Sequence, residues 1–234
     1  MIQSDKTRAI VLQTFRYGDE SLITHLFTED IGLQSFIIRG AYRRRAKIGA
    51  AFFQIMTPLL IVRASSKGEI GYLKEVSLEY PFKTITSDIV KNSVSLFMGE
   101  LLQKSIIGTE KNEVLFSFIH HSLQNLDSAD CIVNDVPLLF ASGLCEILGF
   151  APDTGTYREG FLFSLNEGIF CRGENIGNKF LGREESTAFA NLFGKKVITM
   201  ERRRLLVIML DYYKIHVPGF REINSCEVLR EILK

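Results

Sequence analysis

The alternation of apolar and polar residues changes character near residue 80. Before that point, short segments rich in β-branched and aromatic residues are separated by turn residues, which is typical of strands. Five strands are predicted, and their expected ranges are 8–15, 21–27, 31–39, 52–64 and 69–78. In the last of these we expect a half-buried face formed by alternate residues, namely Ile70, Tyr72, Val76 and Leu78.

Five short strands fit a small closed barrel, and the five-stranded oligonucleotide-binding (OB) barrel is the main candidate. A five-stranded SH3-like barrel would give almost the same pattern, so the residues alone leave both open. Pro58 lies inside the fourth predicted strand. Because proline has no N–H to donate, we expect an edge position or a bulge there.

Beyond Tyr80 the apolar residues recur at helical spacing. The predicted helices cover 88–107, 112–126, 134–148, 184–193 and 201–216, and Ser225 is expected to cap a last helix through Leu233. A β-hairpin with a glycine-containing turn is predicted near 160–172. The expected fold is therefore α+β with two domains: an OB-fold nucleic-acid-binding domain over 1–80, and a mostly α-helical domain over 81–234 that carries the hairpin as an insert.

Two local features of the predicted helices bear on possible sites. Thr86 or Ser87 is available to cap the first helix. His120 and His121 are neighbours in the second helix, so they face different directions and cannot easily share a metal. We expect both histidines to be at the surface or half-buried.

Composition bounds the function classes. Hydrophobic residues make up 46% and charged residues 24% of the chain, and the net charge is +1, so any attraction to a polyanion must be local. The N-terminal segment lacks the apolar run of a signal peptide, and no apolar stretch is long enough to span a membrane. Together with four dispersed cysteines, this predicts free thiols in a reducing cytoplasm, with no membrane partner, metal or other cofactor.

Motifs that carry enzymatic chemistry are missing from the sequence. There is no phosphate-binding P-loop, no dinucleotide-binding glycine motif, no HExxH and no GxSxG, and the carboxylates are scattered. A two-metal nuclease site would need a close cluster of carboxylates. We therefore expect a binding protein, with no enzymatic activity and no small-molecule substrate.

The strongest binding signal is the segment that follows the third predicted strand. Five cations and no acid occur within nine residues, 39–47, and Tyr42 lies among them. Cations of this kind neutralise phosphates, and an exposed tyrosine can stack on a base. The candidate nucleic-acid-binding residues are Arg39, Tyr42, Arg43, Arg44, Arg45 and Lys47. The alternative is that this run is only a solvated surface.

Several sequence features resemble the RecO family of bacterial recombination mediators. They are the opening motif "IVL…YGDES", the segment "LFTEDIGL", the loop "RGAYRRR" and an apolar strand after a Gly-Ala step. Later in the chain, "LCEILGFAPD" and the closing "YYKIHVPGFREINSCEVLREIL" follow in the same order as in that family. The resemblance covers nearly the whole chain, and its N-terminal part is the most specific.

This resemblance implies an N-terminal OB fold, a helical C-terminal domain and a role as a DNA-binding recombination mediator in DNA repair. Such a protein binds single- and double-stranded DNA, anneals complementary strands, and helps to load the recombinase RecA with the partners RecR and SSB. The alternative is an OB-fold adaptor that binds protein or RNA and has little affinity for DNA.

The family resemblance also raises the question of a metal. Many members hold zinc with cysteine pairs in the hairpin region, but here only Cys171 stands in such a place. We therefore expect no zinc site. The hairpin is expected to be held by packing of Phe161, Phe163 and Phe170.

A partner site is expected on the helical half. SSB proteins end in an acidic tail with a terminal aromatic residue, so their receptor needs an apolar pocket rimmed by cations. The candidate residues are Lys195, Lys196, Arg202, Arg203 and Arg204. Three consecutive arginines fan out around a helix, so at least one must face solvent. The alternative is that these cations merely keep the helix soluble.

Overall fold

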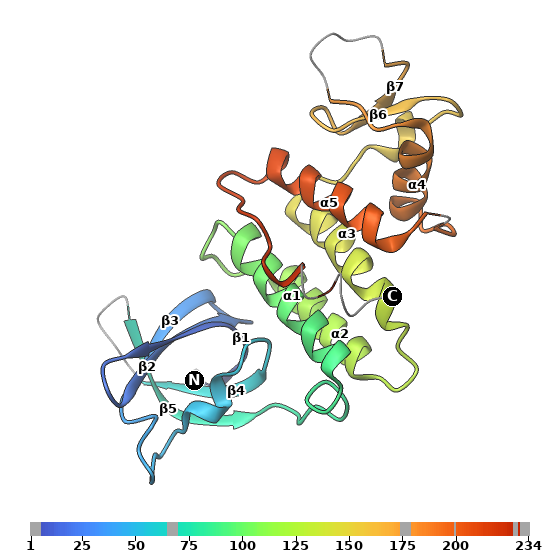
Figure 1. The fold of residues 1–234 in the computed structure, drawn as a ribbon. Helices are drawn as coiled ribbons and strands as arrows, with labels where there is room; N and C mark the ends of the chain where they lie inside the picture. Colours follow the sequence, from blue (N-terminus) through green and yellow to red (C-terminus); the bar gives the residue numbers. More distant parts are fainter. Residues whose placement is uncertain (1–5, 65–69, 174–178, 199, 227–228, 230–234) are drawn as a thin grey trace. The chain divides into compact units, whose positions relative to one another are not determined.

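In the computed structural model of this chain, residues 6–64, 70–173, 179–198, 200–226 and 229 are described. They form two compact units, Met1–Cys131 and Ile132–Lys234, whose elements are shown in Figure 1. Strands give way to helices near residue 80, but the first unit also contains two helices. Whether the barrel over 1–80 forms a folding domain without those helices stays a prediction.

The first unit begins with a closed barrel whose strand order is β1-β2-β3-β5-β4 (Figure 1). β1 pairs with both β2 and β4, and β3 pairs with β5 in parallel. This is the topology of the OB fold, so the expected fold class is confirmed. The strands are β1 (Lys6–Tyr17), β2 (Ser21–Thr28), β3 (Gly32–Ile38), β4 (Pro58–Ala64) and β5 (Ile70–Leu78).

The barrel is filled by alternate side chains from its strands. Val11, Leu22, Leu26, Leu59 and Ile61 are completely buried in one cluster. Full burial of a side chain of this size stabilises the fold by about 1.5–3 kcal/mol. The interior is therefore a packed core, and any ligand must bind on the outside of the barrel.

The fourth strand begins later than the pattern suggested. It starts at Pro58, and residues Ala50–Phe53 form a short 3-10 turn, η1, instead of a strand. Phe53 is buried against the barrel core, and its carbonyl accepts a hydrogen bond from the Thr14 hydroxyl at 2.9 Å. Pro58 is the first residue of its strand, a position that proline tolerates.

The expected half-buried face of β5 was wrong for Ile70, Tyr72 and Leu78, which are exposed. Val76 packs against the core as expected, and Leu73 does so as well. Gly71 faces inward because a Cβ there would lie 2.7 Å from the Phe36 ring. A register shift between Val62 and Arg63 of β4 then changes the phase. Because of the inward glycine and the bulge, simple alternation along the sequence does not identify the face of β5 that packs against the core.

Two helices complete the first unit, α1 (Ile89–Ser105) and α2 (Glu113–Asp127). The cap of α1 is Asp88, whose side chain accepts from two backbone N–H groups, so neither Thr86 nor Ser87 caps the helix. α1 also contacts β1, where the side-chain amide of Gln103 donates to the Leu12 carbonyl at 2.5 Å.

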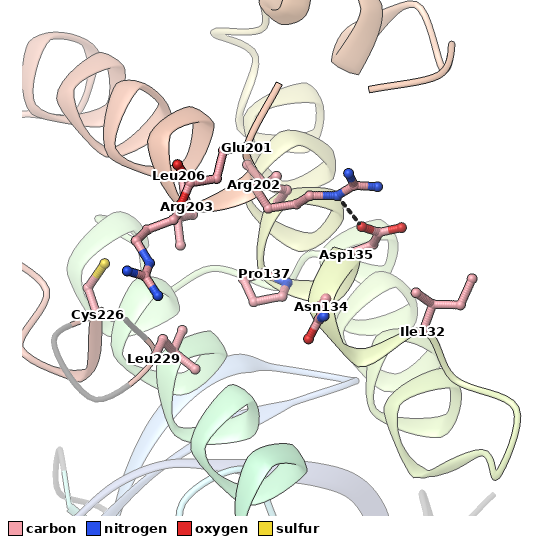
Figure 2. A pocket seen from close by; sticks show the side chains of 11 residues that line it. Ile132, Asn134, Asp135, Pro137, Glu201, Arg202, Arg203, Leu206, Cys226 and Leu229 are labelled. Carbon is pink, nitrogen blue, oxygen red and sulfur yellow. Dashed lines mark hydrogen bonds and ion pairs between the residues drawn. The ribbon is translucent and has the colours of Figure 1, made fainter. Parts of the chain in front are cut away.

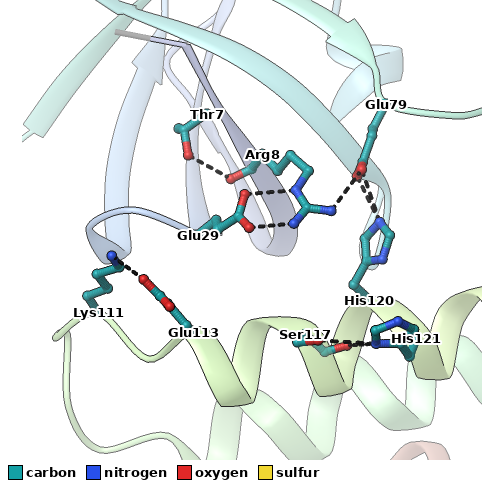
Figure 3. A network of polar contacts seen from close by, with 9 residues as sticks. All are labelled: Thr7, Arg8, Glu29, Glu79, Lys111, Glu113, Ser117, His120 and His121. Atoms are coloured by element: carbon teal, nitrogen blue, oxygen red, sulfur yellow. Dashed lines mark hydrogen bonds and ion pairs between the residues drawn. The ribbon is translucent and has the colours of Figure 1, made fainter. Parts of the chain in front are cut away.

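A charged network links the barrel to α2 (Figure 3). The Arg8 guanidinium donates to both carboxylate oxygens of Glu29 and lies over the Phe116 ring at 5.3 Å. It also contacts Glu79, which in turn bonds His120 Nε2 at 3.0 Å. His120 is buried in this network, not half-buried as expected, whereas His121 is exposed and bonds Ser117 on its own helix.

The chain between barrel and helices is fixed by Asp127 at the end of α2. Its carboxylate accepts from the backbone N–H groups of Lys83, Thr84 and Ile85 at 2.8–3.0 Å. Burial disfavours the ionised form, but these hydrogen bonds outweigh that effect, and the pKa of Asp127 lies below its ordinary value. The buried Lys91 ammonium completes the junction by donating to the Thr84 hydroxyl and the Ser128 carbonyl.

Replacing Asp127 by alanine is expected to lower the free energy of unfolding by about 3 kcal/mol, because buried N–H groups lose their acceptor. Since the folded pKa is lower than the unfolded one, the carboxylate contributes its full stability above the ordinary pKa and loses it as pH falls through the folded value. Denaturant titrations at neutral and acidic pH measure both effects. Asp130→Ala, at an exposed position nearby, serves as the control; equal effects of the two substitutions would contradict this assignment.

The described residues of the second unit include the helices α3, α4 and α5 and a small hairpin. The helices α3 (Val136–Leu148), α4 (Arg183–Phe193) and α5 (Arg202–His216) follow the sequence prediction closely, and α3 ends at Gly149 with φ +83°. Short 3-10 turns are η2 (Val133–Asp135) and η3 (Thr154–Thr156). Most of the expected last helix through Leu233, namely residues 227–228 and 230–233, lies outside the described residues.

The hairpin, β6 (Leu162–Ser164) and β7 (Ile169–Cys171), is held by aromatic packing. The buried rings of Phe163 and Phe170 lie 4.8 Å apart, and Phe163 also contacts Phe189 and Tyr212. Phe161 is half-buried and less central than expected. Among the described residues, no group of three histidine, cysteine or carboxylate side chains is arranged to hold a metal, and the absence of zinc stays a prediction.

Candidate nucleic-acid interface

The basic segment forms a structured loop between β3 and η1. Gly40 adopts φ +67° and turns the chain away from the strand. The buried Ala41 anchors the loop in the barrel core, and its carbonyl accepts from the Ala50 N–H at 3.0 Å. The Tyr42 N–H donates to the Glu20 carbonyl at 3.1 Å, which joins the loop to the β1–β2 turn. Both ends of the loop are therefore fixed, and its side chains are held outward.

Tyr42 is 46% exposed, as expected from its place among polar residues. The guanidinium of Arg16 lies over its ring, 5.2 Å from the ring centre, and Arg16 also donates to the Asp19 carbonyl. Arg16 is a candidate nucleic-acid-binding residue that was not predicted from the sequence. The pattern that could have indicated it is a cation followed by tyrosine at the end of an otherwise apolar strand.

The cations of the loop have different surroundings. Arg43 donates to the Glu20 carboxylate at 2.5 Å, and this partner raises the pKa of Arg43. In the part of the chain that the structure describes, Arg44, Arg45 and Lys47 are exposed and contact no carboxylate. Three cations without acidic partners can exchange their counterions for phosphates directly.

Arg39 lies apart from the tip of the loop. Its guanidinium stacks over the Tyr72 ring at 5.3 Å and donates to the Tyr72 hydroxyl at 3.2 Å. The structure thus divides the predicted residues between two neighbouring settings. Tyr42, Arg43, Arg44, Arg45 and Lys47 belong to the loop, which we call the basic loop, and Arg39 belongs to the sheet surface beside it.

The second predicted cluster lies around the start of α5. Arg202 pairs with Asp135 at 2.9 Å, and Arg204 pairs with Glu185 at 2.8 Å. The N–H of Gly182, and then Arg204, hold the pKa of Glu185 below its ordinary value. Lys195 and Lys196 are exposed after the end of α4.

Arg202 and Arg203 line a cavity of about 360 Å³ within the second unit (Figure 2). Its wall is mainly apolar, and the apolar residues that form it are Ile132, Pro137, Leu138, Leu206, Cys226 and Leu229. Asp135 and Glu201 also reach its rim, so the two arginines are balanced by two acids. Arg204, Lys195 and Lys196 are not among the lining residues.

Two family models match this chain. The model for the N-terminal part of recombination protein O matches residues 1–82, and the model for its C-terminal part matches residues 86–155. None of the helices in the described ranges is long and apolar enough to cross a membrane.

Full-length relatives extend the match to almost the whole chain. The DNA repair protein RecO of Flavobacterium psychrophilum is 34% identical over 97% of this chain and 98% of its own length. The proteins of the same name from Flavobacterium johnsoniae and Phocaeicola vulgatus are 34% and 31% identical, with the same coverage of both chains. The chain therefore belongs to the RecO family of DNA repair proteins.

Proposed function

We propose that this protein is a DNA-binding recombination mediator of DNA repair. In this role it holds DNA through its barrel, promotes the annealing of complementary strands, and helps to load a recombinase together with RecR-like and SSB-like proteins in the cytoplasm. Its own part is to bind and position strands, without an enzymatic reaction.

The observation that carries this proposal is the basic loop. It is fixed to the barrel at both ends, and it presents Arg44, Arg45 and Lys47 without acidic partners among the described residues. Since the chain as a whole carries only +1, this local charge is what would attract a phosphate backbone. Contacts to phosphates carry no sequence information, so broad binding is expected.

Titration of the full-length protein with oligo-dT over a range of salt concentrations tests this proposal. A DNA-binding protein of this kind should lose affinity steeply as salt rises, with a slope of about −0.7 for each phosphate contacted on a single strand. An adaptor for other proteins would bind oligo-dT weakly or not at all, and its protein complexes would be less sensitive to salt. Absence of DNA binding at low salt would refute the proposal.

For the SSB-like partner we infer a receptor at the cavity lined by Arg202 and Arg203. An acidic tail that ends in an aromatic residue needs an apolar cavity with cations at its rim, and this cavity offers both. Since Asp135 already pairs with Arg202, the tail would have to displace that carboxylate or bind mainly through Arg203.

A further inference from the structure

The β1–β2 turn lies against the basic loop and holds it through one residue. The two strands are joined by residues 18–20. The Glu20 carbonyl accepts a hydrogen bond from the Tyr42 N–H at 3.1 Å, and the Glu20 carboxylate accepts one from Arg43 at 2.5 Å. Two successive residues of the basic loop are therefore tied to the same residue of the turn.

Arg16 adds a second contact between the turn and the basic loop. Its guanidinium donates to the Asp19 carbonyl at 2.9 Å and lies 5.2 Å from the centre of the Tyr42 ring. One flat group thus contacts the turn and covers a side chain of the loop at the same time. Lysine does not reproduce this role, because its ammonium is compact and strongly hydrated.

The shape of the turn depends on Gly18. Its φ of +63° lies in the left-handed region, and no described atom lies within 4 Å of the place where a Cβ would be. A β-branched residue there would strain the backbone without a clash. The turn can therefore be loosened at Gly18 without a change in charge or in any residue of the basic loop.

Contacts of this kind lower the cost of binding DNA. A loop residue that is mobile in the free protein must become ordered when it binds a phosphate, and this ordering costs conformational entropy. Here the turn already fixes the Tyr42 backbone, while Ala41 and Ala50 fix the ends of the loop. The exposed cations that follow Tyr42 therefore start from an ordered backbone.

We propose that the β1–β2 turn and Arg16 form a clamp that pre-organises the basic loop, and that Arg16 is a positioning residue that acts through Tyr42 and not by contact with a phosphate. The inference rests on the proposed function. It gives Glu20 two opposite roles: its carbonyl holds the loop in place, whereas its carboxylate occupies Arg43 until DNA displaces it.

A positioning residue and a phosphate contact have different effects on a salt titration. The slope depends on the counterions that are released, about 0.7 for each phosphate contacted on a single strand. Loss of a contact flattens the slope, whereas loss of pre-organisation lowers the affinity and leaves the slope unchanged. Single strands and duplexes should be affected alike, because the same cations bind the phosphates of both.

Arg16→Lys in the full-length protein, titrated with oligo-dT and with a duplex hairpin, is the first test. The charge is kept, so a phosphate contact would survive this change. We expect instead a loss of roughly five- to thirtyfold on both DNAs with an unchanged slope, which corresponds to ordering about one loop residue at the moment of binding. Wild-type affinity in Arg16→Lys, with a flatter slope in Arg16→Ala, would make Arg16 a phosphate contact and overturn its positioning role.

Gly18→Val tests the clamp without altering any charge. It should lower the affinity for both DNAs by a similar factor, again with an unchanged slope. Gly18→Asn should stay within about twofold of the wild-type protein, because asparagine tolerates the left-handed region. Gly160→Val places the same strain in the second unit, at φ +82° with open space around the Cβ, and should leave DNA binding unchanged.

Hydrogen exchange of single amides in the free protein measures the order of the loop directly. The Tyr42 N–H should exchange faster in Arg16→Lys and Gly18→Val than in the wild-type protein. The Ala50 N–H, bonded to the Ala41 carbonyl at the other end of the loop, should keep its rate. Faster exchange at both amides would show general destabilisation, and an unchanged rate at Tyr42 would show that the clamp does not order the loop; either result overturns the inference.

The outcome separates this inference from the proposed function. If the wild-type protein binds neither DNA, the proposed function fails and the inference fails with it. If it binds both DNAs and the Arg16→Lys and Gly18→Val variants bind them equally well, only the inference is overturned.

Discussion

Alanine at Arg43, Arg44 and Arg45 together is expected to flatten the salt dependence of oligo-dT binding by up to about two units in a log–log plot. Each phosphate contact on a single strand contributes about 0.7 to this slope, and the variant removes three exposed cations of the basic loop. With a slope that is two units flatter, the affinity of the variant falls roughly 100-fold less than that of the wild-type protein when the salt concentration rises tenfold. Fluorescence anisotropy with labelled oligonucleotides measures both quantities.

The loss should affect all sequences alike, because contacts to phosphates do not read bases. Duplexes should be weakened as well, because their phosphates attract the same cations. If the triple variant keeps the wild-type affinity and slope, the basic loop is only a solvated surface, and the DNA contact lies elsewhere.

Glu20→Gln provides a control of opposite sign for the same loop. The Glu20 carboxylate holds the Arg43 side chain at 2.5 Å, so the neutral amide should release this cation for DNA. Affinity for oligo-dT is expected to rise and the slope to steepen by less than one unit. A glutamine variant with weaker DNA binding would show that Glu20 positions Arg43 for contact instead of competing for it.

The barrel and the basic loop were predictable from sequence because both leave local signals. Each strand shows alternation or an apolar run over a few residues, and the loop gathers five cations without an acid. Tyr42 was expected to be exposed for the same local reason, since it lies among charged residues.

Features that depend on the pairing of distant segments were not predictable. The outward position of Tyr72 follows from the contact of Gly71 with Phe36 on β3, and a bulge at Lys74 of β5 changes the phase between Tyr72 and Val76. Arg16 lies over the Tyr42 ring because the loop is joined to the β1–β2 turn, where the Glu20 carbonyl accepts a hydrogen bond from the Tyr42 N–H. Sequence spacing carries none of this information.

The predicted partner site near α5 shows the same limit of prediction from sequence. The charge run suggested five equivalent residues, but ion pairing makes them different. Arg202 and Arg203 line the cavity, whereas Arg204 is bound to Glu185 on α4. A sequence reading cannot assign these partners, because Asp135 and Glu185 are far away along the chain.

An acidic peptide with the tail sequence of an SSB protein should therefore bind through Arg202 and Arg203 in particular. We expect a variant with Arg202→Glu and Arg203→Glu to lose roughly 30-fold or more in peptide affinity, which is typical of central interface arginines. Wild-type affinity should fall with salt without vanishing, because apolar burial in the cavity is not screened. Isothermal calorimetry on the full-length protein measures both effects.

Matched variants decide whether the cavity is the receptor. Lys195→Glu/Lys196→Glu makes the same change in charge at residues that do not line the cavity, so it should cost much less affinity. Asp135→Asn frees Arg202 from its partner and should strengthen peptide binding, the opposite of the arginine variant. Ile132→Ala trims an exposed apolar residue at the cavity and should weaken binding without changing its salt dependence. Equal losses in the arginine and lysine variants would show that the peptide is attracted by positive charge in general and is not bound in the cavity. Absence of peptide binding by the wild-type protein would show that the proposed SSB-like partner is wrong.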